Sequence, residues 1–230
     1  MRLRLHYPLE RGSLARYLGY PSGQALRRDQ LPLLQQVERE ILQTAVPRCV
    51  FARYPLRRDE EGLAVGETGM LLAGRDIALH LAGCHSVILL AVTLGAGIDR
   101  LLLQAGAQDV ARSVMLDAAA SVAAEQAADA AEQAAKEALC GAGEHHTGRF
   151  SPGYGDLPIA LQRQLIPLLD AQRQIGLAAT RDAILTPRKS VTALIGVADG
   201  PVSGRLAGCD HCLLREKCEW RKRGMRCGGA

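Results

Sequence analysis

Aromatic residues are scarce in this 230-residue chain: phenylalanine, tyrosine and tryptophan together make up 3% of it. The core must therefore be aliphatic, and a surface that stacks the bases of single-stranded nucleic acid is not expected. Apolar runs are short, and none reaches the ~18 residues that a membrane-spanning helix requires. The opening residues, MRLRLHYPLERGS, lack the apolar core of a secretory signal. We therefore expect a cytoplasmic protein without a membrane segment.

Charge of one sign is not concentrated in any long run, although the net charge is +4. The basic clusters, such as Arg221-Lys222-Arg223, are short and are interpreted as solvated surface, so no nucleic-acid partner is expected. Hydrophobic residues make up 48% and charged residues 23% of the chain, a balance typical of globular proteins. The length suits one large domain or two small ones.

Helical and strand patterns are interspersed without regular alternation, which favours an α+β fold over a doubly wound one. The run SVILLAVTLG from Ser86 is typical of a strand buried on both faces. We expect a strand from Cys49 whose proline suits only an edge or an end, a helix that breaks at Gly106, and an alanine-rich helix that can lie close to the sheet. Further helices are expected at 12–20, 28–44, 76–81, 108–139 and 159–169, and strands at 63–65 and 190–198.

Seven cysteines, an odd number, argue against a disulfide framework and for free thiols or metal ligands. Composition changes near Gly200, so we divide the chain into a domain at 1–200 and a Cys-rich tail at 201–230. Four tail thiols could bind zinc or an iron–sulfur cluster, although their spacing matches no standard pattern. His211 could replace one ligand, and reduced free cysteines are the alternative. The candidate metal ligands are Cys209, Cys212, Cys218 and Cys227.

The stretch RFSPGYGDLP, from Arg149 to Pro158, interrupts this helix-rich sequence. Arg149 offers a planar fork of donors suited to a carboxylate, and Tyr154 adds a flat ring with a hydroxyl group. The alternative is a plain pair of consecutive turns, which Pro-Gly and Tyr-Gly favour. Composition alone does not decide between a site and a turn.

The long helix carries charged residues on one face, at offsets of four, three and four. A carboxylate there could hold a cationic group of a ligand. The alternative is a solvated face with an i,i+4 ion pair between Glu132 and Lys136. The residues are Glu125, Asp129, Glu132 and Lys136.

Three motifs follow one another in the second half of the chain: RFSPGYGDLPIALQRQLIPLL, then IGLAAT, then TPRKSVTALIGVA. Their order resembles the activation (reactivation) domain of vitamin B12-dependent methionine synthase. That family has an Arg-x-x-Pro-Gly-Tyr segment and a helix, an Ile/Met-Gly-Leu-x-Leu-Thr segment, and a Pro-x-x-Ser-Val-Ser strand. LARYLGY, PRCVFARYPL and LAGCHSVILLAVTLG look like the first half of free-standing members. The resemblance covers nearly all of residues 1–198.

The resemblance implies a twisted, mainly antiparallel sheet flanked by long helices, and binding of S-adenosylmethionine. It implies that Arg149 and the backbone of Ser151 contact this cofactor, with Gly153 shaping the loop. Tyr154 would lie close to the cofactor and the corrin, and Glu125 aligns best with a helix glutamate of the family.

The chain departs from the family pattern at several positions. The family's second acidic contact has only Glu144 nearby, one position out of register, and Arg181 stands where an acid usually follows the Leu-Thr pair. The tyrosines after the last strand are replaced by GPVSGR, and the Cys-rich tail is not part of the synthase domain.

The function implied by the resemblance is accessory: reactivation of cob(II)alamin on a separate cobalamin-carrying methionine synthase, in methionine biosynthesis. The methyl transfer belongs to cobalamin, so no catalytic acid or base is expected here. Flavodoxin or ferredoxin would supply an electron. The alternatives are a redox or metal-cluster activator of another corrinoid-dependent methyltransferase, and an interaction module that binds no cofactor.

Overall fold

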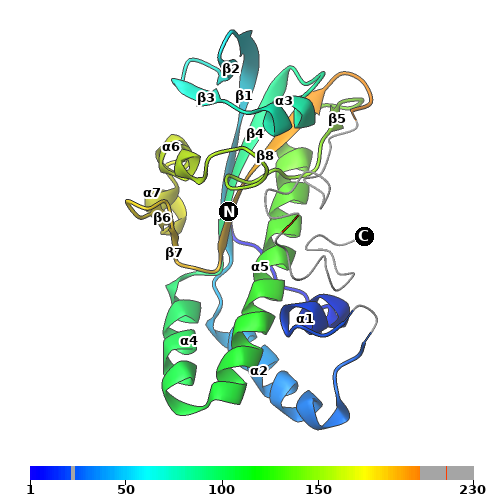
Figure 1. The fold of residues 1–230 in the computed structure, drawn as a ribbon, viewed down its shortest axis with the longest axis vertical. Coiled ribbons are helices and arrows are strands. Elements are labelled where there is room, and N and C mark those ends of the chain that lie inside the picture. The colour runs from blue at the N-terminus through cyan, green and yellow to red at the C-terminus, as the bar shows by residue number, and fades with distance from the viewer. Residues whose placement is uncertain (22–23, 203–215, 217–230) are drawn as a thin grey trace.

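The computed structural model describes residues 1–21, 24–202 and Glu216. Its centre is a six-stranded sheet in the order β3-β2-β1-β4-β8-β5, with every neighbouring pair antiparallel (Figure 1). A separate two-stranded ribbon pairs β6 with β7. The strands are β1 (Arg48–Asp59), β2 (Gly62–Val65), β3 (Met70–Leu72), β4 (Ser86–Thr93), β5 (His145–His146), β6 (Ala178–Ala179), β7 (Leu185–Thr186) and β8 (Ser190–Ala198).

Successive side chains of β4 enter two different cores, one on each face of the sheet. Ile88, Leu90 and Val92 belong to the first core, whereas Val87 and Leu89 belong to the second. Every residue of β4 is buried, which confirms the strand covered on both faces.

Four helices cover the first core: α1 (Arg11–Tyr17), α2 (Leu31–Thr44), α4 (Ala96–Gln108) and α5 (Val110–Leu139). Figure 1 shows α5 extending along the sheet, with the other three helices around its N-terminal half. Most of the α5 residues that face this core are alanines, so the helix packs closely against the strands. A 3-10 turn (Arg28–Gln30) leads into α2.

The second core lies under smaller elements: α3 (Arg75–His80), α6 (Gln162–Leu168) and α7 (Ala171–Ile175), together with β2 and β3. A 3-10 turn (Ile159–Leu161) leads into α6. The combination of helices with an antiparallel sheet confirms the predicted α+β class. Within the described residues, no helix has the length and apolar character needed to cross a membrane.

Two local predictions can be compared with the structure. Of the two places predicted for Pro55, an edge strand is excluded because β1 lies between β2 and β4, whereas an end of the pairing is found. Proline is tolerated there because Pro55, opposite Ser86, is the last residue paired with β4, and pairing with β2 starts at Leu56. The predicted break before the long helix is present but lies at Asp109 rather than at Gly106, because α4 continues to Gln108.

Candidate functional site

The chain enters the RFSPGYGDLP motif beside β8, where the pairing contains one extra residue. Thr147 continues the β5 register and donates its N–H to the Gly196 oxygen at 3.0 Å. Phe150 lies opposite Leu194, and the two exchange backbone hydrogen bonds of 2.9 and 2.8 Å. Two residues, the second of them Arg149, therefore stand against a single residue of β8. This arrangement is a β-bulge.

The bulge determines which face of the sheet Arg149 occupies. A Cβ atom added to Gly196, opposite Thr147, would point at Leu81 of the second core. In a regular ladder Arg149, two residues after Thr147, would face the same core. Phe150 takes that direction instead, and Arg149 points toward α5.

Arg149 contacts the charged face of α5 that the helical spacing predicts. Its Nη1 donates to Glu132 Oε2 at 2.6 Å and its Nη2 to Asp129 Oδ1 at 2.7 Å, while Glu125 Oε2 is 3.7 Å away. Burial acts to lower the pKa of the guanidinium, but the hydrogen bond to Asp129 and the neighbouring carboxylates outweigh burial and raise it. Arg149 is therefore a permanent cation.

We give the name acid–arginine cluster to Arg149 together with the charged residues of this α5 face, Glu125, Asp129, Glu132 and Lys136. The predicted i,i+4 pair is present, because Lys136 Nζ donates to Glu132 Oε1 at 2.5 Å. Three carboxylates face two cations, which leaves one negative charge. The side chain of Asp129 is 70% exposed and that of Glu125 46%, whereas that of Arg149 is 19% exposed. The cluster is thus open to solvent at Asp129 and Glu125.

Next to Arg149 and Glu125, which are both predicted to bind the cofactor, the structure brings Asp129 and Glu132, two residues of the predicted helix face. Their offsets of four and seven residues from Glu125 place them on the same helix face, and this signal is present in the sequence. The helical spacing does not predict which way the side chain of Arg149 points, because the bulge that directs it depends on the pairing with β8.

The motif after Arg149 folds into consecutive turns, as one of the two interpretations predicts. Tyr154 N–H donates to the Ser151 oxygen at 3.0 Å, and Leu157 N–H donates to the Tyr154 oxygen at 3.0 Å. Gly153 has a φ of +94°, a conformation that side-chain-bearing residues rarely adopt. Tyr154 is 50% exposed, and its ring meets that of Phe150 edge-on at 6.1 Å. The turns therefore present Tyr154 at the surface.

Glu144 does not join the acid–arginine cluster. Its Oε2 accepts hydrogen bonds from Arg53 Nη1 at 2.8 Å and from the Gly141 N–H at 2.6 Å, and its Oε1 accepts from Arg53 Nη2 at 2.5 Å. The hydrogen bonds from Arg53 and then that from Gly141 lower the pKa of Glu144 to about 2. Its carboxylate is therefore committed to Arg53.

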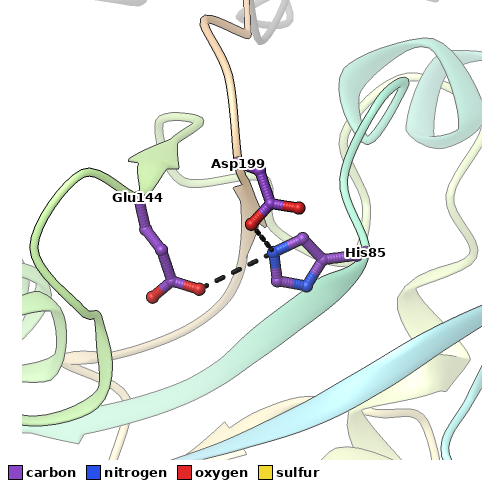
Figure 2. Close-up of side chains that lie close together, drawn as sticks. All are labelled: His85, Glu144 and Asp199. Atoms are coloured by element: carbon purple, nitrogen blue, oxygen red, sulfur yellow. Dashed lines mark ion pairs between the residues drawn. The ribbon is translucent and has the colours of Figure 1, made fainter.

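Figure 2 shows one ring nitrogen of His85 directed toward the carboxylates of both Glu144 and Asp199. His85 Nε2 is 3.3 Å from Asp199 Oδ1 and 3.6 Å from Glu144 Oε1. These three side chains could each offer one ligand atom to a metal ion, and the three atoms lie within 4.8 Å of one another. No other such group is found among the described residues. Because Arg53 binds both oxygens of Glu144, we interpret the group as an ion-pair network.

The predicted metal ligands Cys209, Cys212, Cys218 and Cys227 lie outside the described residues, as does His211. Three other cysteines, Cys49, Cys84 and Cys140, are free thiols. Burial raises the pKa of each, so the thiolate form that binds metal is disfavoured there.

Comparison with known proteins identifies a solved structure with a similar fold. No protein-family model matches the chain, and no curated protein matches it. A crystal structure of the MetH reactivation domain bound to AdoHcy superposes with a TM-score of 0.57. The match covers 97% of this chain and 78% of that chain, at 18% sequence identity. The two chains share a fold, which agrees with the sheet and helices that the sequence motifs imply.

Proposed function

We propose that this protein binds S-adenosylmethionine between the acid–arginine cluster and the turns of Ser151–Tyr154. Bound there, the cofactor would serve the reductive methylation of cob(II)alamin on a separate methionine synthase. The observation that carries the proposal is the position of Arg149. Its guanidinium lies 2.6–2.7 Å from the carboxylates of Glu132 and Asp129, which share a face of α5 with Glu125. The MetH reactivation domain, which has the same fold, is bound to AdoHcy.

The charges of the ligand match those of the cluster. S-adenosylmethionine carries a carboxylate, an ammonium group and a sulfonium. The fork of Arg149 suits the carboxylate, and Glu125 and Asp129, the two more exposed acids, suit the cationic groups.

Binding requires an exchange of partners, because Arg149 is already paired. The Asp129 carboxylate is the partner to be displaced, since its side chain is 70% exposed and readily solvated, whereas that of Glu132 is 18% exposed. The ligand carboxylate takes the place of Asp129 on Nη2, and Asp129 turns to the ligand ammonium group. Glu132 keeps Arg149 in position throughout.

The net charge of the cluster predicts a preference between two related ligands. S-adenosylmethionine has a net charge of +1, whereas AdoHcy, which lacks the sulfonium, is neutral. The three carboxylates and two cations leave a charge of −1, so S-adenosylmethionine is favoured. Salt should reduce this preference, because the acids are partly exposed.

The loop supplies the remaining contacts in this proposal. The backbone of Ser151 contacts the ligand. Gly153 maintains the turn, because the turn requires a positive φ at this position. The Tyr154 ring, which is half exposed, would lie where cofactor and corrin meet.

We propose further that the protein acts in trans as an accessory component. Cob(II)alamin must gain one electron before it can accept a methyl group from a sulfonium, so a flavodoxin or ferredoxin is the expected donor. The products would be methylcobalamin on the partner and AdoHcy here. The assay is methionine formation by a cobalamin-loaded synthase without its own activation domain, with and without this protein.

Calorimetric titration tests the binding site. Arg149→Ala should weaken S-adenosylmethionine binding by at least about tenfold, since it removes a charge-assisted pair. Arg112→Ala is the matched control, because Arg112 also pairs with a carboxylate, Glu40, at 2.7 Å, but at the start of α5.

Two results would contradict different parts of the proposal. No binding by the unaltered protein at millimolar S-adenosylmethionine would exclude the function. Binding that Arg149→Ala leaves unchanged would exclude the assigned site.

A further inference from the structure

The short helix α3 is attached to the RFSPGYGDLP turns and to the residue before them, although the partners are 68 to 81 residues apart in sequence. At its start, the backbone N–H groups of Arg75 and Asp76 donate to the Asp156 carboxylate, at 2.6 Å to Oδ2 and 3.1 Å to Oδ1. At its end, His80 Nε2 lies 3.0 Å from the Gly148 oxygen. A carbonyl oxygen only accepts, so Nε2 carries the proton and donates.

Asp156 thus performs the role of a helix cap from a distant segment. The residue that precedes α3 is Gly74, which has no side chain to cap the helix. The Asp156 carboxylate satisfies two of the N–H groups that every helix leaves without an internal partner. The pairing fixes the end of the turns to the start of α3.

Two glycines make this approach possible. A Cβ atom on Gly74 would lie 2.5 Å from Asp156 Oδ1, and one on Gly155 would lie 2.3 Å from Asp76 Oδ2. The two segments therefore cross where both lack a side chain. At the other attachment, the buried His80 ring packs on Phe150 with centroids 4.9 Å apart.

We propose that α3 positions the ligand loop, and that Asp156 and His80 are positioning residues for S-adenosylmethionine binding. Gly148 is directly before Arg149, and Asp156 lies in the second turn, two residues after Tyr154. The two attachments therefore bracket the residues assigned to the ligand. This inference rests on the proposed function.

The attachment has a thermodynamic consequence. We call the loop docked when Asp156 and His80 hold it against α3. If only the docked loop binds ligand, the apparent affinity falls in proportion to the fraction of molecules whose loop is docked. By linkage, ligand must also stabilise docking, and so protect the N–H groups of Arg75 and Asp76 from exchange. If Asp156 served stability alone, ligand would slow exchange only through global unfolding, and therefore not preferentially at Arg75 and Asp76.

The test compares Asp156→Ala with Asp99→Ala in the full chain. Asp99 is the matched control, because its carboxylate also accepts from a distant backbone N–H, that of Arg188, at 3.0 and 3.2 Å. Asp156→Ala should weaken S-adenosylmethionine binding by up to about tenfold, which corresponds to losing a helix cap. Asp99→Ala should leave the affinity unchanged, and Asp156→Asn, which keeps one acceptor oxygen, should restore part of it.

Hydrogen exchange supplies the second measurement. Saturating S-adenosylmethionine should slow exchange at Arg75 and Asp76 in the unaltered protein and not in Asp156→Ala. Gly74→Ala should weaken binding while keeping the Asp156 carboxylate, which separates positioning from direct ligand contact. Its control is Gly69→Ala, where φ is also positive and no atom lies within 4 Å of the new Cβ.

The outcomes distinguish this inference from the proposed function. Equal affinities of the unaltered protein, Asp156→Ala and Gly74→Ala would overturn the role of α3 and leave the ligand site intact. Absence of binding by the unaltered protein would overturn both proposals.

Discussion

The guanidinium of Arg53 in β1 binds both oxygens of Glu144, which lies directly before β5 at the other side of β4 and β8. The two distances are 2.8 and 2.5 Å, and Arg53 also donates to the Leu139 oxygen at the end of α5, at 2.7 Å. The pair therefore connects an inner strand, the end of the long helix and the segment that leads to Arg149.

Acid should weaken the fold through this pair. The Arg53 and Gly141 hydrogen bonds hold the pKa of Glu144 at about 2 in the folded protein, against an ordinary value of 4.5. The unfolded chain takes up the proton at higher pH, so the stabilisation is complete above about pH 4.5 and is lost as pH falls toward 2. Urea unfolding of Glu144→Gln should show a smaller pH dependence in this window than the unaltered protein.

The control is Glu137→Gln on α5, a carboxylate that accepts from the Gln133 amide rather than from a cation. An equally steep pH dependence in Glu144→Gln and the unaltered protein would contradict this assignment.

Arg11→Ala should destabilise the protein strongly. Its partner Glu38 has a side chain with no exposed surface, which accepts from Arg11 at 2.7 and 3.2 Å and from the Leu9 N–H at 3.0 Å. Removing Arg11 leaves a buried carboxylate without a cation, and the free energy of unfolding should fall by about 3 kcal/mol. Urea denaturation measures the change.

Arg27→Ala provides the contrast, because the Arg27–Asp29 pair is exposed on both sides and should contribute little to stability. Equal losses in the two variants would show that burial of Glu38 is not the cause.

Gly196→Ala should also destabilise the fold, through a steric clash rather than through backbone strain. A Cβ at this position of β8 would lie 2.5 Å from Cys84 Sγ and 2.7 Å from Leu81 Cδ2. Overpacking of this kind costs about 1–3 kcal/mol. Cys84→Ala in the same chain should recover part of the loss in thermal unfolding, whereas Gly200→Ala, with no atom within 4 Å, should have little effect.

The Cys-rich tail should bind metal, as its four thiols predict. Protein purified without oxygen should contain zinc or iron by elemental analysis, and Cys209→Ser with Cys212→Ser should lower the content. Cys84→Ser should not, because burial raises the pKa of that thiol. Equal metal content in all variants would contradict the assignment.

Local patterns predict most of the elements. The apolar run 190–198 corresponds to β8, and the alanine-rich helix is found as α5. Pairing explains one departure, because Pro55 is tolerated in an inner strand where β1 changes partners. A second departure lies between α4 and α5, where the chain turns at Asp109 rather than at Gly106. Asp109 caps α5 by accepting the Arg112 N–H at 3.1 Å, a signal that the glycine obscured.

The sequence by itself determines the acidic face of α5, since residues three and four apart on a helix share a side whatever surrounds them. It also determines the turns after Arg149, because proline and glycine restrict the backbone locally. Only the tertiary structure decides that Arg149 meets the acids. One extra residue in the pairing with β8 turns its side chain from the second core to α5, and register is a property of two strands together.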